Sequence, residues 1–275
     1  MSTTREEFAR LAARGDDEID LAEGALLIAA EACPDLDVAH HLGRLDALAE
    51  QARPRLQGAG PLAAERLAQL NAFLFEEQGF VGNRSVYDDP RNSYLNEVLE
   101  RRTGIPITLA VLHIEVARRL GLRVEGVNFP GHFLARHVGE SALLIDAFEG
   151  RFVTAEECAV RLRATLGDDA TLERHHLARA TPKQILARIL RNLKNIHARA
   201  GELDTALGCC DRILLLLPND PSELRNRGLV YEGLEAFTAA KADFERFLEL
   251  APDDPSAPAV HTRLQRLRQK VAQLN

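Results

Sequence analysis

The sequence has no long apolar run. No stretch approaches the length of about 18 apolar residues that spans a membrane, and the opening MSTTREEFARLAARGDDEID contains no apolar signal core. These absences argue against a membrane protein and against export. We therefore expect a soluble, cytoplasmic protein that has no membrane partner.

Cysteine is scarce in the sequence. The four residues are Cys33, Cys158, Cys209 and Cys210, and none forms a CxxC pair or stands at zinc-ligand spacing with the histidines. A disulfide between the adjacent Cys209 and Cys210 would be strained. We expect four buried thiols in a reducing compartment, with no metal and no cofactor.

Basic residues are outnumbered and scattered. The net charge is -7: from Pro182 onward there are 14 Lys and Arg against 12 Asp and Glu, and the preceding residues hold 20 against 29. No segment forms a basic stripe that could follow a phosphate backbone. Nucleic acid is therefore not an expected partner.

The pattern of apolar residues divides the chain into three segments. At 275 residues it is long enough for two domains that each bury a core. Apolar residues at three- and four-residue spacing predict that residues 1–78 are a helical N-terminal region of the core domain. Residues 79–181 form the core itself, and residues 182–275 are helical again.

The core segment predicts a buried helix on a small antiparallel sheet. Pro106 suits the first turn of a helix that runs to Gly121, with apolar residues nearly all the way round it. Short β runs follow at residues 122–129, 132–138 and 142–148, the last two joined by a turn at 139–141. The expected fold class is α+β.

The C-terminal segment contains a repeat. The stretches CCDRILLLLPND and DFERFLELAPDD superpose with Pro218 and Pro252 separated by 34 residues, the tetratricopeptide period. Other packing positions match at the same offset: Ala206 with Ala240, Leu214 with Leu248, and His197 with Tyr231. We expect two repeats within residues 182–275, closed by a capping helix.

Three stretches of the core carry a family resemblance. EEQGFVGN, DPRNSYLNEVLERRTGIPI and PGHFLARH resemble the transglutaminase-like, papain-related fold, and the whole chain with its repeats resembles the bacterial SirB-type family. The resemblance implies a cysteine at the N-terminus of the central helix, followed by a histidine and an aspartate on adjacent strands. His132 and Asp146 match that histidine and that aspartate.

The nucleophile of the motif is missing. Gly104-Ile105-Pro106 occupies the Gly-x-Cys motif of the resembling fold, so Pro106 stands where the cysteine would be and no thiolate can form there. Thr108 supplies a hydroxyl nearby that could approach His132. The alternative is that Thr108 bonds back to a carbonyl of the preceding turn, as helical threonines often do.

The remaining polar residues have two interpretations each. In an active relative Asp146 would orient His132, which would take the proton of the nucleophile; alternatively the two form a buried structural pair. Three further residues, with Pro106, are candidates for the wall of a pocket: Asn92, Ser93 and Asn96. Helix capping and turn formation are their alternative roles.

Two functions follow from these patterns. The first is a catalytically degenerate protein whose core supplies a pocket and whose repeats bind a protein or peptide. The second is an amide-bond hydrolase or acyltransferase in which His132 is the general base and Thr108 or water attacks. Because Pro106 replaces the cysteine, we favour the first function.

Overall fold

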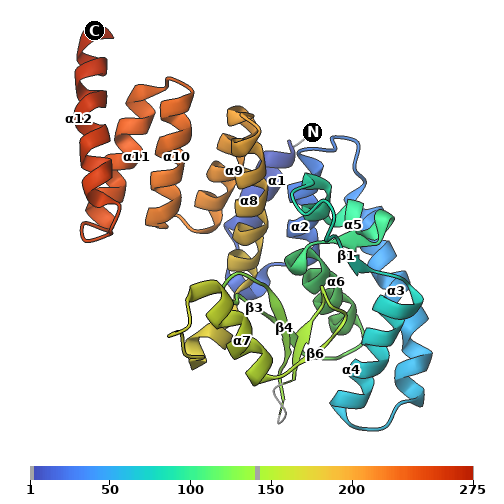
Figure 1. Ribbon diagram of the computed structural model, residues 1–275. Helices are drawn as coiled ribbons and strands as arrows, with labels where there is room; N and C mark the ends of the chain where they lie inside the picture. The colour runs from blue at the N-terminus through green and yellow to red at the C-terminus, as the bar shows by residue number, and fades with distance from the viewer. Residues whose placement is uncertain (1–2, 140–142, 275) are drawn as a thin grey trace. The chain divides into compact units, whose positions relative to one another are not determined.

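The computed structural model describes residues 3–139 and 143–274 (Figure 1). The chain divides into two compact units, Met1–Ile185 and Leu186–Asn275. The first unit combines helices with a sheet, and the described part of the second unit is helical.

Four helices open the first unit, and polar side-chain caps mark where the first three of them begin. They are α1 (Thr4–Ala12), α2 (Leu21–Ala30), α3 (Val38–Gly58) and α4 (Ala63–Asn71), which continues into a π-helical turn, Ala72–Glu77. Asp20 accepts a hydrogen bond from the Glu23 N–H at the start of α2, and Asp37 accepts one from the His40 N–H at the start of α3. Nine of the ten residues of α2 are buried, so this helical region is part of the core.

The central helix α6 (Pro106–Arg119) begins at the proline from which we predicted its start. The chain leaves the helix near Gly121, whose φ of 74° is the left-handed conformation that glycine adopts readily. Twelve of its fourteen residues are buried, as the sequence predicts. Short elements precede it: β1 (Val81–Gly82), the 3₁₀ turn η3 (Pro90–Ser93), α5 (Leu95–Arg101) and β2 (Thr103–Gly104), which pairs with β1 in parallel.

Helix α6 packs on a five-stranded antiparallel sheet with the order β6-β5-β4-β3-β7. The strands are β3 (Val124–Val127), β4 (Leu134–His137), β5 (Leu144–Asp146), β6 (Arg151–Val153) and β7 (Arg179–Ala180). Each of the three predicted β runs contains one strand, but the sequence did not predict β6 or β7. Residues 140 and 141 of the predicted turn lie outside the described residues. Helix α7 (Ala155–Leu166) packs Cys158 and Leu162 against sheet residues, and the α+β class is confirmed.

The second unit contains the predicted repeats. Its helices are most of α8 (Pro182–Arg199), with α9 (Leu203–Leu216), α10 (Pro221–Gly233), α11 (Phe237–Leu250) and α12 (Ala257–Leu274). Ala206 and Ala240 are fully buried, and a Cβ atom on Gly228 would lie 2.6 Å from the Phe244 ring, so that position requires glycine. Helix α12 covers the end of the second repeat with four buried residues: Ala257, Val260, Leu264 and Leu267.

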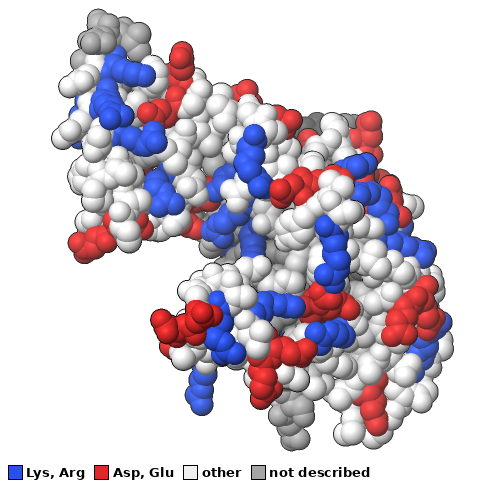
Figure 2. Space-filling view, viewed as in Figure 1, with Lys and Arg blue, Asp and Glu red and all other residues white. Residues whose placement is uncertain are grey.

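Charges of both signs are interspersed over the face of the first unit that Figure 2 shows. Helix α12 differs, because its charged residues are all basic: Arg263, Arg266, Arg268 and Lys270. Arg263 pairs with Glu232 and Arg268 with Glu245, so acidic partners from α10 and α11 balance part of this charge.

Candidate functional site

His132 and Asp146 meet across two adjacent strands. His132 lies in the turn before β4, and Asp146 is the last residue of β5, which pairs with β4 in antiparallel fashion. The imidazole Nε2 lies 3.0 Å from Asp146 Oδ1. The aspartate side chain is fully buried, whereas 12% of the histidine side chain remains exposed. The pair therefore presents one partly accessible imidazole backed by a buried carboxylate.

Asp146 has a second partner, a guanidinium group, that the sequence did not reveal. Arg161 on α7 donates a hydrogen bond from Nη1 to Oδ2 at 2.7 Å. The backbone N–H groups of Phe148 and Glu149 donate to Oδ1 at 3.1 and 3.2 Å. Burial raises the pKa of Asp146, but His132 and Arg161 together outweigh it and bring the pKa to about 2. The carboxylate is therefore ionised across the physiological pH range.

Aromatic side chains adjoin the imidazole. The Phe148 ring stands edge-on to His132 with centroids 6.2 Å apart, and Tyr87 stands edge-on to Phe148 at 6.4 Å. Gly82 lets Phe148 approach the backbone, because a Cβ atom there would lie 2.5 Å from the ring. Tyr87 and its neighbour Val86 are both exposed.

The Thr108 hydroxyl is bonded to the backbone. It donates toward the Asn92 carbonyl at 2.7 Å, with the Ile105 carbonyl at 3.2 Å, and accepts from the Ile105 N–H at 3.1 Å. A hydroxyl has a single proton to donate, and here a carbonyl receives it. In the described part of the chain no hydrogen bond joins Thr108 to His132. Pro106, two residues earlier, is the first residue of α6 and is buried.

Asn92 has a role other than the helix cap that we considered for it. Helix α5 begins at Leu95 without a side-chain cap, so neither Asn92 nor Ser93 caps it, because both lie in the preceding 3₁₀ turn. The Asn92 amide donates to the Val86 carbonyl at 2.8 Å and accepts from Asn83 Nδ2 at 3.1 Å. Asn92 therefore fixes the loop that carries Val86 and Tyr87, which adjoins the His132 site.

Ser93 and Asn96 are buried with unused polar atoms. Ser93 Oγ and Asn96 Oδ1 have no hydrogen-bond partner among the described residues. The Asn96 amide lies 4.0 Å from Cys33 Sγ. Cys33 is only partly buried, whereas the other three thiols are buried, so one of the four differs from our expectation. This contact places Asn96 beside the turn that follows α2.

The described residues contain no group of three or more His, Cys, Asp or Glu side chains that could hold a metal ion. Within the same residues, no helix combines the length and the apolar composition that crossing a bilayer requires.

Known proteins resemble the chain along most of its length. A family model of the transglutaminase-like superfamily matches residues 39–191, and a tetratricopeptide repeat model matches residues 193–265. A UPF0162 protein of Xylella fastidiosa is 42% identical over 259 residues, which cover 92% of each chain. A UPF0162 protein of Vibrio cholerae is 34% identical over 261 residues, 91% of this chain and 93% of the relative.

The SirB-type resemblance seen in the sequence is confirmed as well. Protein SirB1 of Salmonella typhimurium is 28% identical over 208 residues, which cover 75% of this chain and 77% of the relative. The chain therefore belongs to the UPF0162/SirB family of transglutaminase-like proteins that carry tetratricopeptide repeats.

Proposed function

We propose that this protein is a catalytically degenerate member of the transglutaminase-like superfamily that binds a protein or peptide and performs no covalent chemistry. The observation that carries the proposal is the start of α6. The family resemblance implies that Pro106 occupies the position of the nucleophile, and the Thr108 hydroxyl is bonded to backbone groups of Asn92 and Ile105. An acyl transfer needs a nucleophile that a base can deprotonate.

The repeats supply the surface for a partner. On α10, Arg225 reaches Ser256 just before α12, and Glu232 pairs with Arg263 on α12. Leu229 lies between them at helical spacing and is 38% exposed, so it belongs to the face that α10 and α12 form together. In an array of helical repeats, the face that the first helix of each repeat lines commonly forms the binding surface. We therefore assign partner binding to the face that contains Leu229.

The test is capture of a partner by the full-length protein and by two matched variants. Leu229→Asp places a charge on the α10 face, and Leu215→Asp places one on the exposed side of α9, where Leu215 is 45% exposed. A partner retained by the wild type should be lost with Leu229→Asp and kept with Leu215→Asp. Equal retention by all three proteins would contradict the assignment of this face.

A second candidate function is hydrolysis of an amide bond by water, with His132 as the general base. The observation that favours it is the intact pair, in which a buried, ionised Asp146 orients a partly exposed imidazole. Release of ammonia from glutamine-containing peptides by the wild type, abolished by His132→Ala, would distinguish it from the first function.

A further inference from the structure

A hollow in the first unit is lined by residues other than His132 and Asp146. It has a volume of about 390 Å³. The C-terminal half of α6, strands β3 and β7, and the residues before and at the start of α2 enclose it. This volume lies in the range of about 300 to 1,000 Å³ that is usual for small-molecule sites. Part of its wall is apolar: Ile19, Leu21, Ile114, Val124, Pro182 and Ile185.

The charged side chains of this cavity are mainly acidic. Five carboxylates line it, Asp17, Glu18, Asp20, Glu115 and Glu125, against two guanidinium groups, Arg118 and Arg179. Arg118 pairs with Asp20 at 3.1 Å, and Arg179 pairs with Asp17 at 3.2 Å. Arg119 and Arg136, which lie outside the lining, also pair with Glu115 and Glu125. Five carboxylates therefore face four guanidinium groups, and the one carboxylate in excess favours a cation over an anion.

Glu115 has one carboxylate oxygen that accepts no hydrogen bond from the described residues. Its side chain is only 3% exposed. Arg118 donates to Oε2 from Nε at 3.2 Å and from Nη2 at 2.8 Å, and Arg119 donates to the same oxygen from Nη1 at 2.6 Å. The other oxygen, Oε1, is left with unused acceptor capacity in a residue that lines the cavity.

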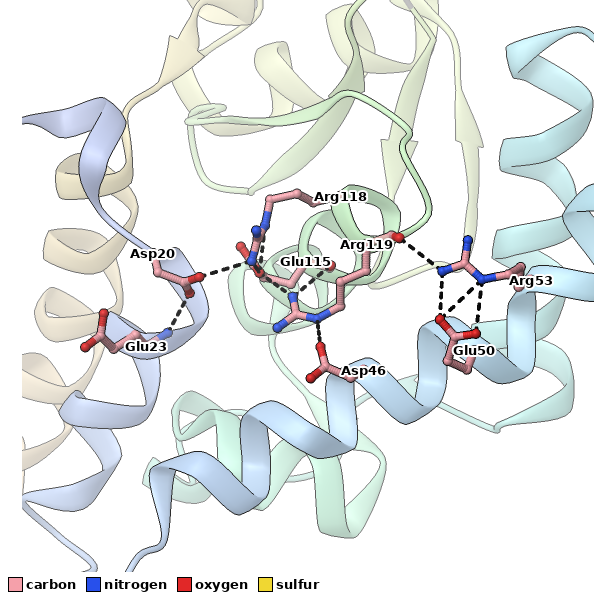
Figure 3. A network of polar contacts seen from close by, with 8 residues as sticks. All are labelled: Asp20, Glu23, Asp46, Glu50, Arg53, Glu115, Arg118 and Arg119. Carbon is pink, nitrogen blue, oxygen red and sulfur yellow. Dashed lines mark hydrogen bonds and ion pairs between the residues drawn. The ribbon is translucent and has the colours of Figure 1, made fainter.

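The surrounding network holds this carboxylate in place. Figure 3 shows Arg118 and Arg119 converging on Glu115. Asp20 at the start of α2 holds Arg118, and Asp46 on α3 binds Arg119 Nε at 2.6 Å. Three helices thus fix Glu115 before any ligand arrives, which reduces the entropy lost on binding.

We propose that this cavity binds a primary ammonium or guanidinium group on a short aliphatic stem. The cation donates to Oε1 of Glu115, and the stem lies along the apolar wall beside Ile114 and Val124. Two sources share this chemistry: a free aliphatic amine, and a lysine or arginine side chain of a peptide. The proposal stands independently of the function assigned to the His132 site.

Calorimetric titration of the full-length protein tests this assignment. The probes are cadaverine and agmatine for the free amines and N-acetyl-lysine amide for the peptide side chain, with 1-pentanol and glutarate as neutral and anionic controls. At least one cationic probe should bind, and the two controls should not. Binding of the blocked lysine alone identifies a peptide as the source, and binding of the free amines identifies a small molecule.

Three variants locate the binding. Glu115→Gln should lower the affinity for the cationic probe by about tenfold, as expected for the loss of one charged hydrogen bond. Glu50→Gln removes an exposed carboxylate on α3 that pairs with Arg53 and does not contact Glu115, so it should leave the affinity nearly unchanged. Val124→Trp fills the cavity, keeps every charge and should abolish binding. Absence of binding by all three cations, or unchanged affinity in both Glu115→Gln and Val124→Trp, would overturn the proposal.

Discussion

Arg161 on α7 and Asp146 on β5 form a hydrogen-bonded ion pair of 2.7 Å at the carboxylate oxygen that His132 does not contact. The carboxylate is thus held from both sides, by an imidazole and by a guanidinium. Arg161 touches His132 only through Asp146, so we regard it as a positioning residue for the imidazole.

Replacement of Arg161 by Gln should raise the pKa of Asp146. The folded-state pKa of about 2 lies below the ordinary value of 3.8, so the ionised carboxylate stabilises the fold above about pH 4, and this stabilisation is lost as the pH falls toward 2. The full shift corresponds to about 2 kcal/mol. Arg161→Gln should lower the free energy of unfolding at pH 7 and should reduce the further decrease between pH 4 and 2. Arg161→Lys should give values between those of the wild type and Arg161→Gln. Urea unfolding across this pH range measures the free energy of unfolding of the three proteins. Identical pH profiles for the wild type and Arg161→Gln would contradict the positioning role.

Mutation of His113 should alter stability in weakly acidic solution. His113 on α6 is fully buried beside Asn71, and burial lowers its pKa from 6.5 to about 4. Because the unfolded chain binds the proton first, stability is complete above about pH 6.5 and falls by about 3 kcal/mol as the pH drops to 4. His113→Gln should remove this dependence, and His40→Gln, at an exposed histidine, should keep it. A persistent loss of stability in His113→Gln between pH 6.5 and 4 would assign the effect to another group.

The two residues of the buried ion pair in the repeats should be energetically coupled. Lys194 on α8 contacts both oxygens of Glu223 on α10 at 2.8 Å, and their side chains are 6% and 0% exposed. Lys194→Met leaves a buried carboxylate without its main partner and should cost about 3 to 5 kcal/mol. The double variant Lys194→Met, Glu223→Gln should recover part of that loss. Lys241→Met, at an exposed pair, should cost less than about 1 kcal/mol.

Chemical unfolding of the wild type, Lys194→Met, Glu223→Gln, the double variant and the control Lys241→Met completes this comparison. If the double variant were destabilised by the sum of the two single changes, Lys194 and Glu223 would not be energetically coupled.

A cysteine introduced at position 106 should acquire a lowered thiol pKa. A thiol at the first turn of α6 meets the positive end of the helix dipole, and the resemblance also places it beside His132. In a Cys33→Ser background, Pro106→Cys should add an ultraviolet thiolate absorbance with an apparent pKa below about 8.5, whereas burial raises the pKa of Cys158 and of Cys210. Adding His132→Ala should move this pKa upward. If His132→Ala had no effect on the pH profile, position 106 would not face the histidine.

The parts of the fold that depend on local sequence could be predicted. Pro106 and Gly121 mark the ends of α6 because each residue has a distinctive backbone preference, and the spacing of Pro218 and Pro252 reveals the repeats. Strand β7 was missed because two residues, Arg179 and Ala180, carry no alternating pattern.

The polar networks could not be predicted, because they join distant parts of the chain. Arg118 and Asp20 are 98 residues apart in sequence. Arg161 follows Asp146 by 15 residues but belongs to a helix that could have faced either way. The one signal was its position beside Leu162 and three residues after Cys158, both of which are buried on α7.

The most direct test of the proposed loss of catalysis is an amide-turnover measurement on the full-length wild-type protein, with glutamine-containing peptides and free amines as substrates. We expect no release of ammonia and no amine incorporation above the level of His132→Ala. Turnover by the wild type that His132→Ala abolishes, in a variant that remains folded, would contradict the proposal and establish the protein as an enzyme.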